Sequence, residues 1–402
     1  MRGARLALLL LVAVPLSCHE TVRPTEVAAA DAAPGAMAAM PPDTAPGHDV
    51  DPAAMPTRPM PLISRGLPSF ASHEAYPAEA AFDADYATEW RSAHVPTTSD
   101  PDWIAIDLTT VPPAARASVY SLWFNEAGYD YDTADGASYA LPGDYEIQSH
   151  AATGDRQPPT AGWVTVVRRL GNTLSSGADL LHLGDAGWLR LVCTANPRNT
   201  AAQNHYVALQ WALYDARAGV DAWKFVGDSI TANAMTHAAT NDAFDQLVAR
   251  QVPNAPAFEM AGHGFWSSET TLGAIHAYLA RFPGRFVGLS LGTNDEDPAA
   301  YRTHMTELVD DVLAAGKQPV VPTIPYTGEP AHLAVIPRLN DVVRELYASY
   351  GPRLVVGPDL YDVLYQGRAV MFDQPTDLHP NRRGDAAIRQ AWADAMVMRL
   401  YR

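Results

Sequence analysis

Cysteine and basic side chains are scarce in this sequence. Only Cys18 and Cys193 occur among 402 residues, which excludes a framework of structural disulfides. Lysine and arginine number 28 against 45 acidic residues, giving a formal net charge of -17 at pH 7. This balance argues against a nucleic-acid partner and against a polybasic patch that would bind an anionic membrane. We therefore expect a soluble, acidic protein that binds no nucleic acid.

The sequence also lacks an apolar run long enough to span a membrane. Arg2 and Arg5 precede the apolar run 6–16, whose length and layout are those of a secretory signal rather than a spanning helix. We predict a signal peptide over residues 1–18. Its end, Leu16-Ser17-Cys18, resembles that of a bacterial lipoprotein signal. The resemblance implies an exported bacterial protein, periplasmic or on the cell surface, that is attached to the membrane through a lipidated Cys18. Secretion after cleavage near Ser17 stays open, because Pro15 replaces the usual leucine.

Residues 19–60 lack hydrophobic periodicity and are rich in Ala, Pro, Met, Asp and Thr. Such a composition buries too little apolar surface to offset chain entropy, so we predict a disordered tether. About 340 residues follow, enough for two domains. No internal repeat is present. Cys193 lies in the apolar run 188–194 and is predicted to be a buried, small hydrophobic side chain.

Residues 61–216 contain short alternating runs separated by turn residues, a pattern typical of an all-β sandwich or jelly roll. Examples are the runs 103–108, 144–149 and 162–167. The segments 80–92, 102–108 and 206–214 resemble the discoidin or coagulation-factor type C domains of the galactose-binding-like fold. Such domains often bind glycans, and Tyr129, Tyr131 and Tyr139 are candidate stacking residues. Each of these tyrosines has the alternative role of a partly buried loop anchor.

The same resemblance implies a structural calcium ion in the loop that contains Asp83, Asp85 and Thr88. Gln210 occupies the position where the family has a glutamate. Because calcium sites gain affinity from carboxylate ligands, this neutral side chain weakens the case for tight binding. The alternative is a charged turn capped by Thr88.

In the last part of the chain, an apolar strand leads directly into a serine at the expected start of a helix, in Phe225-Val226-Gly227-Asp228-Ser229. Helix starts carry unpaired backbone N–H groups and a positive dipole end, which stabilise an alkoxide or an oxyanion. A cap formed by Asp228 or Ser229 is the alternative explanation. Three further segments favour a catalytic serine over a helix cap. They are a glycine block ending at Gly262-His263-Gly264, the segment Gly292-Thr293-Asn294-Asp295, and Asp377-Leu378-His379-Pro380-Asn381.

Together these blocks resemble the GDSL or SGNH hydrolases over residues 217–402. The resemblance implies that Ser229 attacks an ester carbonyl while His379 takes its proton. It also implies an oxyanion hole made by the backbone N–H groups of Ser229 and Gly262 and the side-chain amide of Asn294. No cofactor is expected for catalysis. His263, Phe265 and Trp266 are candidates for lining the acyl or leaving-group pocket, with local packing as the alternative.

One position departs from the family pattern. Most members have an aspartate three residues before the catalytic histidine, where this chain has Thr376. We predict that Asp377 orients the imidazole instead. Asp373, or a backbone carbonyl that orients a Ser–His dyad, stays open.

The fold expected for residues 217–402 is α/β, with a parallel sheet sandwiched by helices and the site at the carboxyl ends of the strands. We predict strands at 222–228, 258–262, 286–291, 318–323 and 353–357, and helices at 299–315, 334–350 and 384–400.

An exported hydrolase joined to a sugar-binding domain predicts a serine esterase that removes O-acyl groups, above all acetyl groups, from carbohydrate. The expected partner is a polysaccharide or another acylated substrate. A lipid or short-chain esterase and a glycan O-acyltransferase of the same fold are alternatives. A non-catalytic glycan-binding surface lipoprotein is a third, motivated by the displaced Asp377.

Overall fold

The structure is a computed structural model that describes residues 60–92, 94–125, 140–151, 157–196, 206–238, 242–253 and 255–401. The predicted signal, nearly all of the predicted tether, Cys18 and the three candidate glycan-binding tyrosines lie outside these residues. The described residues belong to one compact unit. None of the helices in the described ranges combines the length and the apolar character needed to cross a membrane.

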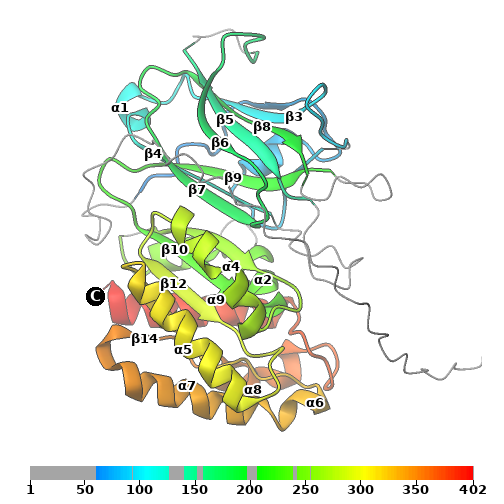
Figure 1. Ribbon diagram of the computed structural model, residues 1–402, viewed down its shortest axis with the longest axis vertical. Coiled ribbons are helices and arrows are strands. Elements are labelled where there is room, and N and C mark those ends of the chain that lie inside the picture. Colours follow the sequence, from blue (N-terminus) through cyan, green and yellow to red (C-terminus); the bar gives the residue numbers. More distant parts are fainter. Residues whose placement is uncertain are drawn as a thin grey trace, which may run out of the picture. The chain divides into compact units, whose positions relative to one another are not determined.

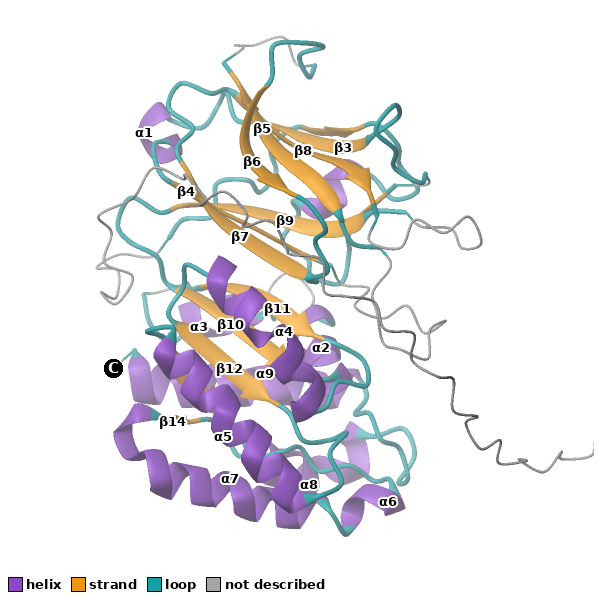
Figure 2. Cartoon of the chain, viewed as in Figure 1, coloured by secondary structure: helices purple, strands orange, loops and turns teal. Residues whose placement is uncertain are grey.

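The first half of the described chain forms two antiparallel sheets (Figure 2). The five-stranded sheet has the order β1-β3-β8-β5-β6, with bounds Ser69–Ala71, Asp102–Asp107, Trp188–Ala195, Asp144–His150 and Val164–Arg169. The four-stranded sheet has the order β2-β9-β4-β7, with bounds Trp90–Arg91, Ala208–Asp215, Val119–Phe124 and Ser176–Leu181. Two short helical turns, η1 (Ala78–Ala81) and α1 (Pro113–Arg116), lie in the connections.

One hydrophobic core is shared by these two sheets. Leu191 and Ile106 of the five-stranded sheet and Leu209 and Trp211 of the four-stranded sheet are fully buried in it. The alternating runs 103–108, 144–149 and 162–167 thus correspond to β3, β5 and β6 within two residues, and the segment 206–214 corresponds to β9. Cys193 of β8 is buried, as predicted, and its burial raises the pKa of the thiol to about 12.

The second half forms a parallel five-stranded sheet with the order β11-β10-β12-β13-β14 (Figure 1). The strands are β10 (Ala222–Gly227), β11 (Ala257–Gly262), β12 (Phe286–Ser290), β13 (Gln318–Val321) and β14 (Val355–Val356). The predicted strands match these within two residues. The largest differences are the end of β13, at 321 instead of 323, and the start of β14, at 355 instead of 353. Arg353, which we predicted as the first residue of β14, instead ends the 3-10 turn η2 (Gly351–Arg353). Pro352 favours a helical turn at this position because its ring fixes the backbone φ angle.

Helices cover both faces of the parallel sheet. Successive contacts join α4 (Ser268–Arg281), α5 (Pro298–Ala314) and α7 (Ile336–Tyr350) into one layer. On the other face, α9 (Arg382–Leu400) contacts α2 (Ser229–Thr236), α3 (Phe244–Ala249) and α8 (Leu360–Met371). The short helix α6 (Pro330–Leu333) precedes α7. The architecture is the predicted parallel sheet sandwiched by helices, and α5, α7 and α9 begin within two residues of their predicted starts.

The parallel sheet and the four-stranded sheet share apolar contacts. Edge strand β11 contacts β4 and β7, and the Phe258 ring of β11 lies 4.9 Å from that of Tyr86 and 6.1 Å from that of Phe124. These residues belong to the same hydrophobic cluster as Phe225 of β10. The half with the parallel sheet is therefore packed directly on the half with the antiparallel sheets.

Candidate active site

Ser229 is the first residue of α2, and only Asp228 separates it from the buried end of β10. The carboxylate of Asp228 caps the helix by accepting hydrogen bonds from the backbone N–H groups of Ile230 (3.0 Å) and Thr231 (3.3 Å). Asp228 is fully buried, which raises the pKa of its carboxyl to about 6. The capping role considered for this motif thus belongs to Asp228, and the Ser229 hydroxyl is left for another partner.

Three neighbouring strand ends carry the predicted site. In the parallel register, Gly227 of β10 pairs with Gly262 of β11 and with Ser290 of β12. A side chain at either glycine would collide with backbone: a Cβ on Gly227 would lie 2.6 Å from the Ser290 carbonyl oxygen, and one on Gly262 would lie 2.7 Å from the Ala232 nitrogen. Both positions therefore need glycine, so that α2 can approach the strand ends closely.

His379 reaches Ser229 across 150 sequence positions. Its Nε2 atom lies 2.8 Å from the Ser229 hydroxyl oxygen. The loop that carries His379 is held at its end by Asn381, which caps α9 by accepting hydrogen bonds from the backbone N–H groups of Arg383 (3.0 Å) and Gly384 (3.4 Å). A nucleophile and a base in hydrogen-bond contact, both half-buried or more, are the geometry of an activated serine.

Burial and three carboxylates act in opposite directions on His379. Desolvation is the larger effect and lowers the pKa of the imidazole below its ordinary value. The negative charges of Asp385, Glu329 and Asp377, in that order, raise it. Asp385, in the first turn of α9, is buried and also contacts His237 Nδ1 at 2.7 Å. Our sequence reasoning missed Asp385, although its place six residues after His379, at the start of the last helix, was a usable signal.

The carboxylates of Asp377 and Asp373 both have partners in the same loop. Asp377 accepts a hydrogen bond from the Gln374 backbone N–H at 2.8 Å, and Asp373 accepts one from the Asn381 side chain at 3.0 Å. Asp377 also acts on His379 through its charge. The structure thus gives both carboxylates a role in shaping the histidine loop, and the orienting role of Asp377 stays a prediction.

The predicted oxyanion donors also have contacts of their own. The Gly262 N–H faces the Met260 sulfur at 3.1 Å, and the Asn294 amide donates to the Trp266 carbonyl at 3.0 Å. Because a side-chain amide has two hydrogens, this contact fixes Asn294 and leaves one N–H for a ligand. Asn294 follows β12, beside the strand that leads to Ser229.

The block after Gly262 links the site to the β-sheet half of the chain. His263 is buried, and its Nε2 contacts the Ser175 hydroxyl at 2.9 Å and the Tyr278 hydroxyl at 2.8 Å. Its ring stacks on Trp266 with a centroid distance of 3.9 Å. These contacts favour local packing for His263, and burial lowers the pKa of the imidazole to about 3. Phe265, in contrast, is 69% exposed and stays a candidate for contact with substrate.

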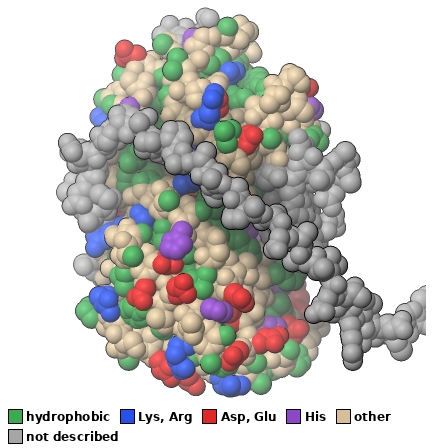
Figure 3. All heavy atoms as spheres, viewed as in Figure 1, with side chains coloured by type: hydrophobic (Ala, Val, Ile, Leu, Met, Phe, Trp, Pro, Cys, Tyr) green, Lys and Arg blue, Asp and Glu red, His purple; other side chains and the backbone are tan. Residues whose placement is uncertain are grey.

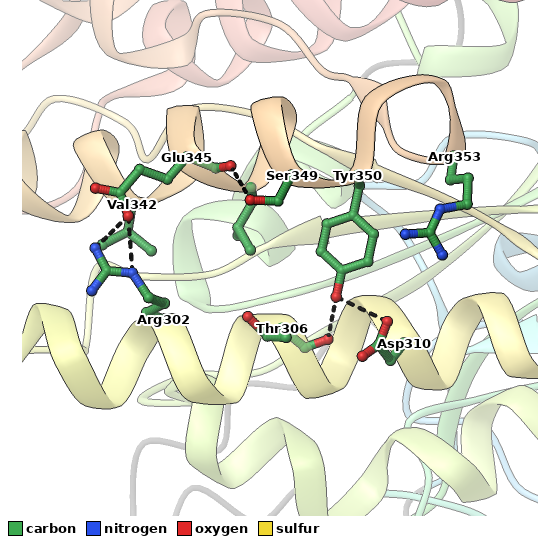
Figure 4. Close-up of a pocket in the computed structure, with 9 residues that line it drawn as sticks. Arg302, Thr306, Asp310, Val342, Glu345, Ser349, Tyr350 and Arg353 are labelled. Atoms are coloured by element: carbon green, nitrogen blue, oxygen red, sulfur yellow. Dashed lines mark hydrogen bonds and ion pairs between the residues drawn. The ribbon is translucent and has the colours of Figure 1, made fainter.

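A hollow between α5 and α7 lies apart from the predicted catalytic residues (Figure 4). Two pairs of its polar side chains are in contact: Arg302 with Glu345 at 2.9 Å, and the Tyr350 hydroxyl with Asp310 at 2.9 Å. On the face drawn in Figure 3, acidic and basic side chains are mixed over the helical half, with no large field of one sign. These features favour a solvated helix surface there rather than a second reaction site.

The loop predicted to hold calcium is satisfied by internal hydrogen bonds. Asp83 accepts from the Thr88 hydroxyl (2.8 Å) and from the Asp85 N–H (2.9 Å). The Gln210 amide nitrogen lies within hydrogen-bond distance of three backbone carbonyls, those of Ala80, Asp85 and Thr88, which share its two hydrogens. An amide donor thus lies where carbonyl oxygens converge. A calcium ion would require Gln210 to turn its oxygen inward, so these residues fit the ion poorly as placed.

Comparison with known proteins agrees with this geometry in the catalytic half. Residues 225–387 match the model of the GDSL-like Lipase/Acylhydrolase family, a range that includes Ser229, Gly262, Asn294 and His379. No curated protein matches the sequence.

Solved structures similar to parts of the chain include a lipolytic G-D-S-L protein from Veillonella parvula, 17% identical, which covers 45% of this chain and 98% of that one with a TM-score of 0.37. A Bacillus subtilis protein, 13% identical, covers 82% and 88% with a TM-score of 0.42. A chitosan-binding module from Paenibacillus sp., 21% identical, covers 38% and 98% with a TM-score of 0.28. With the family match and the Ser229–His379 contact, residues 225–387 form a GDSL-like lipase/acylhydrolase domain.

Proposed function

We propose that this protein is an exported serine esterase that removes O-acyl groups, chiefly acetyl groups, from carbohydrate. The observation that carries the proposal is the 2.8 Å contact between Ser229 Oγ and His379 Nε2 at the carboxyl ends of a parallel sheet. This contact makes the serine a nucleophile with an adjacent base. The family assignment supports an acylhydrolase, and the ester class is our own inference.

The first half of the reaction forms an acyl-enzyme. Ser229 Oγ attacks the ester carbonyl carbon while its proton passes to His379 Nε2, so the imidazole must start neutral with its proton on Nδ1. Burial favours this neutral form, because it lowers the pKa of His379. The developing oxyanion receives hydrogen bonds from the N–H groups of Ser229 and Gly262 and from the Asn294 amide. The C–O bond to the sugar then breaks, and the leaving hydroxyl takes the proton from His379.

The second half repeats these steps with water. His379 removes a proton from the water that attacks the acyl carbon, and the Ser229 oxygen leaves with that proton. Acetate is released and the free enzyme is regenerated. We propose Asp377 as the residue that orients His379, since its charge favours the imidazolium formed in each half-reaction.

The carbohydrate part of the proposal rests on the antiparallel half of the chain. Its order of segments resembles sugar-binding domains, and it packs on the hydrolase strands through Phe258, Tyr86 and Phe124. A rigidly attached binding surface would hold a polymer beside the active site and raise the local concentration of ester groups. Export and lipidation at Cys18 belong to the proposal as predictions from the N-terminal sequence.

The test is the release of acetate from several acetylated polysaccharides, compared with the Ser229→Ala variant as the matched control. We expect release by the parent protein alone, and a steep fall in kcat/KM from acetate to butyrate esters of a soluble alcohol. Activity that rises with acyl-chain length would instead favour a lipid esterase. A serine-directed phosphonate that leaves Ser229 unlabelled at neutral pH, together with no acetate release, would contradict the enzyme and favour a glycan-binding lipoprotein.

A further inference from the structure

Two histidines and an aspartate converge at one edge of the antiparallel half. The Nδ1 atoms of His73 and His94 each lie 2.8 Å from Asp102 Oδ1, and the two imidazole rings stack at a centroid distance of 4.2 Å. One ligand atom from each of the three residues can be chosen so that all lie within 4.8 Å of one another. Asp102 is fully buried, whereas both histidines are partly open to solvent.

The backbone around these side chains is fixed by hydrogen bonds. Asp102 is the first residue of β3, and His73 follows β1, its neighbour in the sheet. The Trp90 indole N–H donates to the His73 carbonyl at 3.0 Å, and the Ser92 hydroxyl donates to the His94 carbonyl at 3.2 Å. These two hydrogen bonds tie the backbone of His73 and His94 to neighbouring side chains, and Asp102 lies at the start of a strand.

The buried carboxylate is incompletely compensated. Its Oδ2 atom is buried and has no hydrogen-bond partner among the described residues, while its Oδ1 atom faces two imidazoles. A buried carboxylate needs a nearby positive charge or several donors. Both imidazole Nδ1 atoms face the same Oδ1 atom of Asp102, and a cation bound between the three side chains would supply the missing positive charge.

The hydrogen-bonding capacity of His94 favours a bound cation as the source of this positive charge. Its Nδ1 faces Asp102, and its Nε2 lies 3.3 Å from Asp100 Oδ2. A neutral imidazole has only one N–H, so donation to Asp102 would direct a nitrogen lone pair at the Asp100 carboxylate. With a cation at Nδ1, the proton sits on Nε2 and donates to Asp100. This carboxylate–histidine–metal order is usual for histidine ligands.

We propose that His73, His94 and Asp102 bind a divalent transition-metal ion, with Zn²⁺ as the best match to two imidazoles and one carboxylate. Zinc sites take these ligands at about 2.0–2.2 Å in tetrahedral geometry, and a water molecule would complete the coordination here. Calcium is a poor match, because it prefers oxygen ligands throughout. The ion would neutralise Asp102 and join the segment after β1 to the β2–β3 connection and to β3, a structural role independent of Ser229.

The experiment uses the full chain without a histidine tag, stripped with a chelator and then titrated with ZnCl₂ in a calorimeter. We expect one equivalent of zinc, confirmed by elemental analysis after gel filtration. His73→Gln and His94→Gln should each weaken binding by at least ~100-fold, and Asp100→Asn by ~10-fold, as outer-shell changes do. The matched control is His276→Gln, which removes a histidine that is 76% exposed and lies in the helical half. It should bind like the parent.

Melting curves provide a second readout, because zinc should raise the melting temperature of the parent and of His276→Gln but not that of His94→Gln. Should the ligand variants fail to fold, Co²⁺ bound to the parent protein still tests the site through its visible absorption bands. No stoichiometric Zn²⁺ or Co²⁺ binding by the parent would overturn the proposal. Unchanged zinc affinity in folded His73→Gln and His94→Gln would overturn it equally.

Discussion

Two regions of the same pair of strands contrast sharply. At the carboxyl ends of β10 and β11, Gly227 and Gly262 provide close backbone approach beside the Ser229 nucleophile. Three residues earlier in the same register, Lys224 pairs with Glu259 in the interior. The first region is recognisable from a short motif, whereas the second depends on which strands become neighbours. Catalysis and the attachment of the antiparallel half are thus built on one pair of strands.

The buried pair is satisfied from both halves of the chain. The Tyr120 hydroxyl of β4 donates to Glu259 at 2.8 Å, and the Ser176 hydroxyl of β7 donates to it at 3.3 Å. The Lys224 ammonium lies 4.9 Å from the centre of the Tyr278 ring. Burial lowers the pKa of Lys224, and Glu259 opposes that shift. Buried charged pairs generally add little net stability, so we expect this pair to act mainly by favouring one arrangement of the two halves.

The largest effect is expected at Ser229, where a substitution should change activity but not stability. Replacing the nucleophile in Ser229→Ala should lower kcat by ~10⁶, as loss of a serine nucleophile does in other hydrolases, while the free energy of unfolding changes little. Hydrolysis of an activated acetate ester and urea unfolding are the two measurements. Residual activity near the parent level would show that another group performs the attack.

Removing one member of the Lys224–Glu259 pair should instead lower stability and change activity little. Glu259→Gln leaves the Lys224 ammonium buried without its carboxylate, so we expect the protein to lose about 3–5 kcal/mol of stability in urea unfolding. At temperatures where the variant is folded, kcat should change far less than in Ser229→Ala. The double variant Lys224→Met/Glu259→Leu is the control and should recover much of the stability. A single variant as stable as the parent would contradict the role assigned to this pair.

An intermediate loss of activity is expected at Asn294. This residue lies at the carboxyl ends of the strands, and its side chain donates a hydrogen bond to the Trp266 carbonyl. Asn294→Ala removes one oxyanion donor and should lower kcat by ~10² to 10³ with little change in KM. The control is Thr303→Ala, an exposed position on α5. Hydrolysis by Asn294→Ala at the parent rate would remove this residue from the oxyanion hole.

A smaller loss is expected for the orienting aspartate. Replacement of a buried aspartate that fixes the histidine tautomer costs ~10⁴ in turnover, but Asp377 is only half-buried, so we expect Asp377→Asn to lower kcat by ~10- to 100-fold. Asp373→Asn is the matched comparison and should have a smaller effect. Equal and small losses in both variants would instead indicate a Ser–His dyad oriented by the backbone.

The pH profile should show the mildest change. His379 must be neutral to accept a proton, and burial lowers its pKa, so kcat/KM should stay high at neutral pH and fall with a midpoint below ~6.5. Because the Asp385 charge raises that pKa, Asp385→Asn should shift the midpoint to lower pH. A midpoint above that of free histidine in the parent would contradict the balance of burial and charge described here.

Several elements of the catalytic half could be predicted from the sequence. The strand that ends in Gly227 and the start of the helix at Ser229 follow from an apolar run that meets a capping aspartate, and both depend only on local interactions. The pairing of Lys224 with Glu259 could not be predicted from such local patterns. Its only signal was one charged residue within each of two buried strands, and the register that joins them is a long-range property.

The sequence alone thus determined the element order, the acidic composition and the chemical identity of the Ser229, Asn294 and His379 side chains. The tertiary structure decided which distant groups act on one another: Asp385 on the charge of His379, Ser175 on His263, and two histidines on Asp102. The physical reason is that hydrogen bonding and helix capping act over a few residues. Burial and Coulomb interactions, in contrast, depend on distances that exist only after the chain has folded.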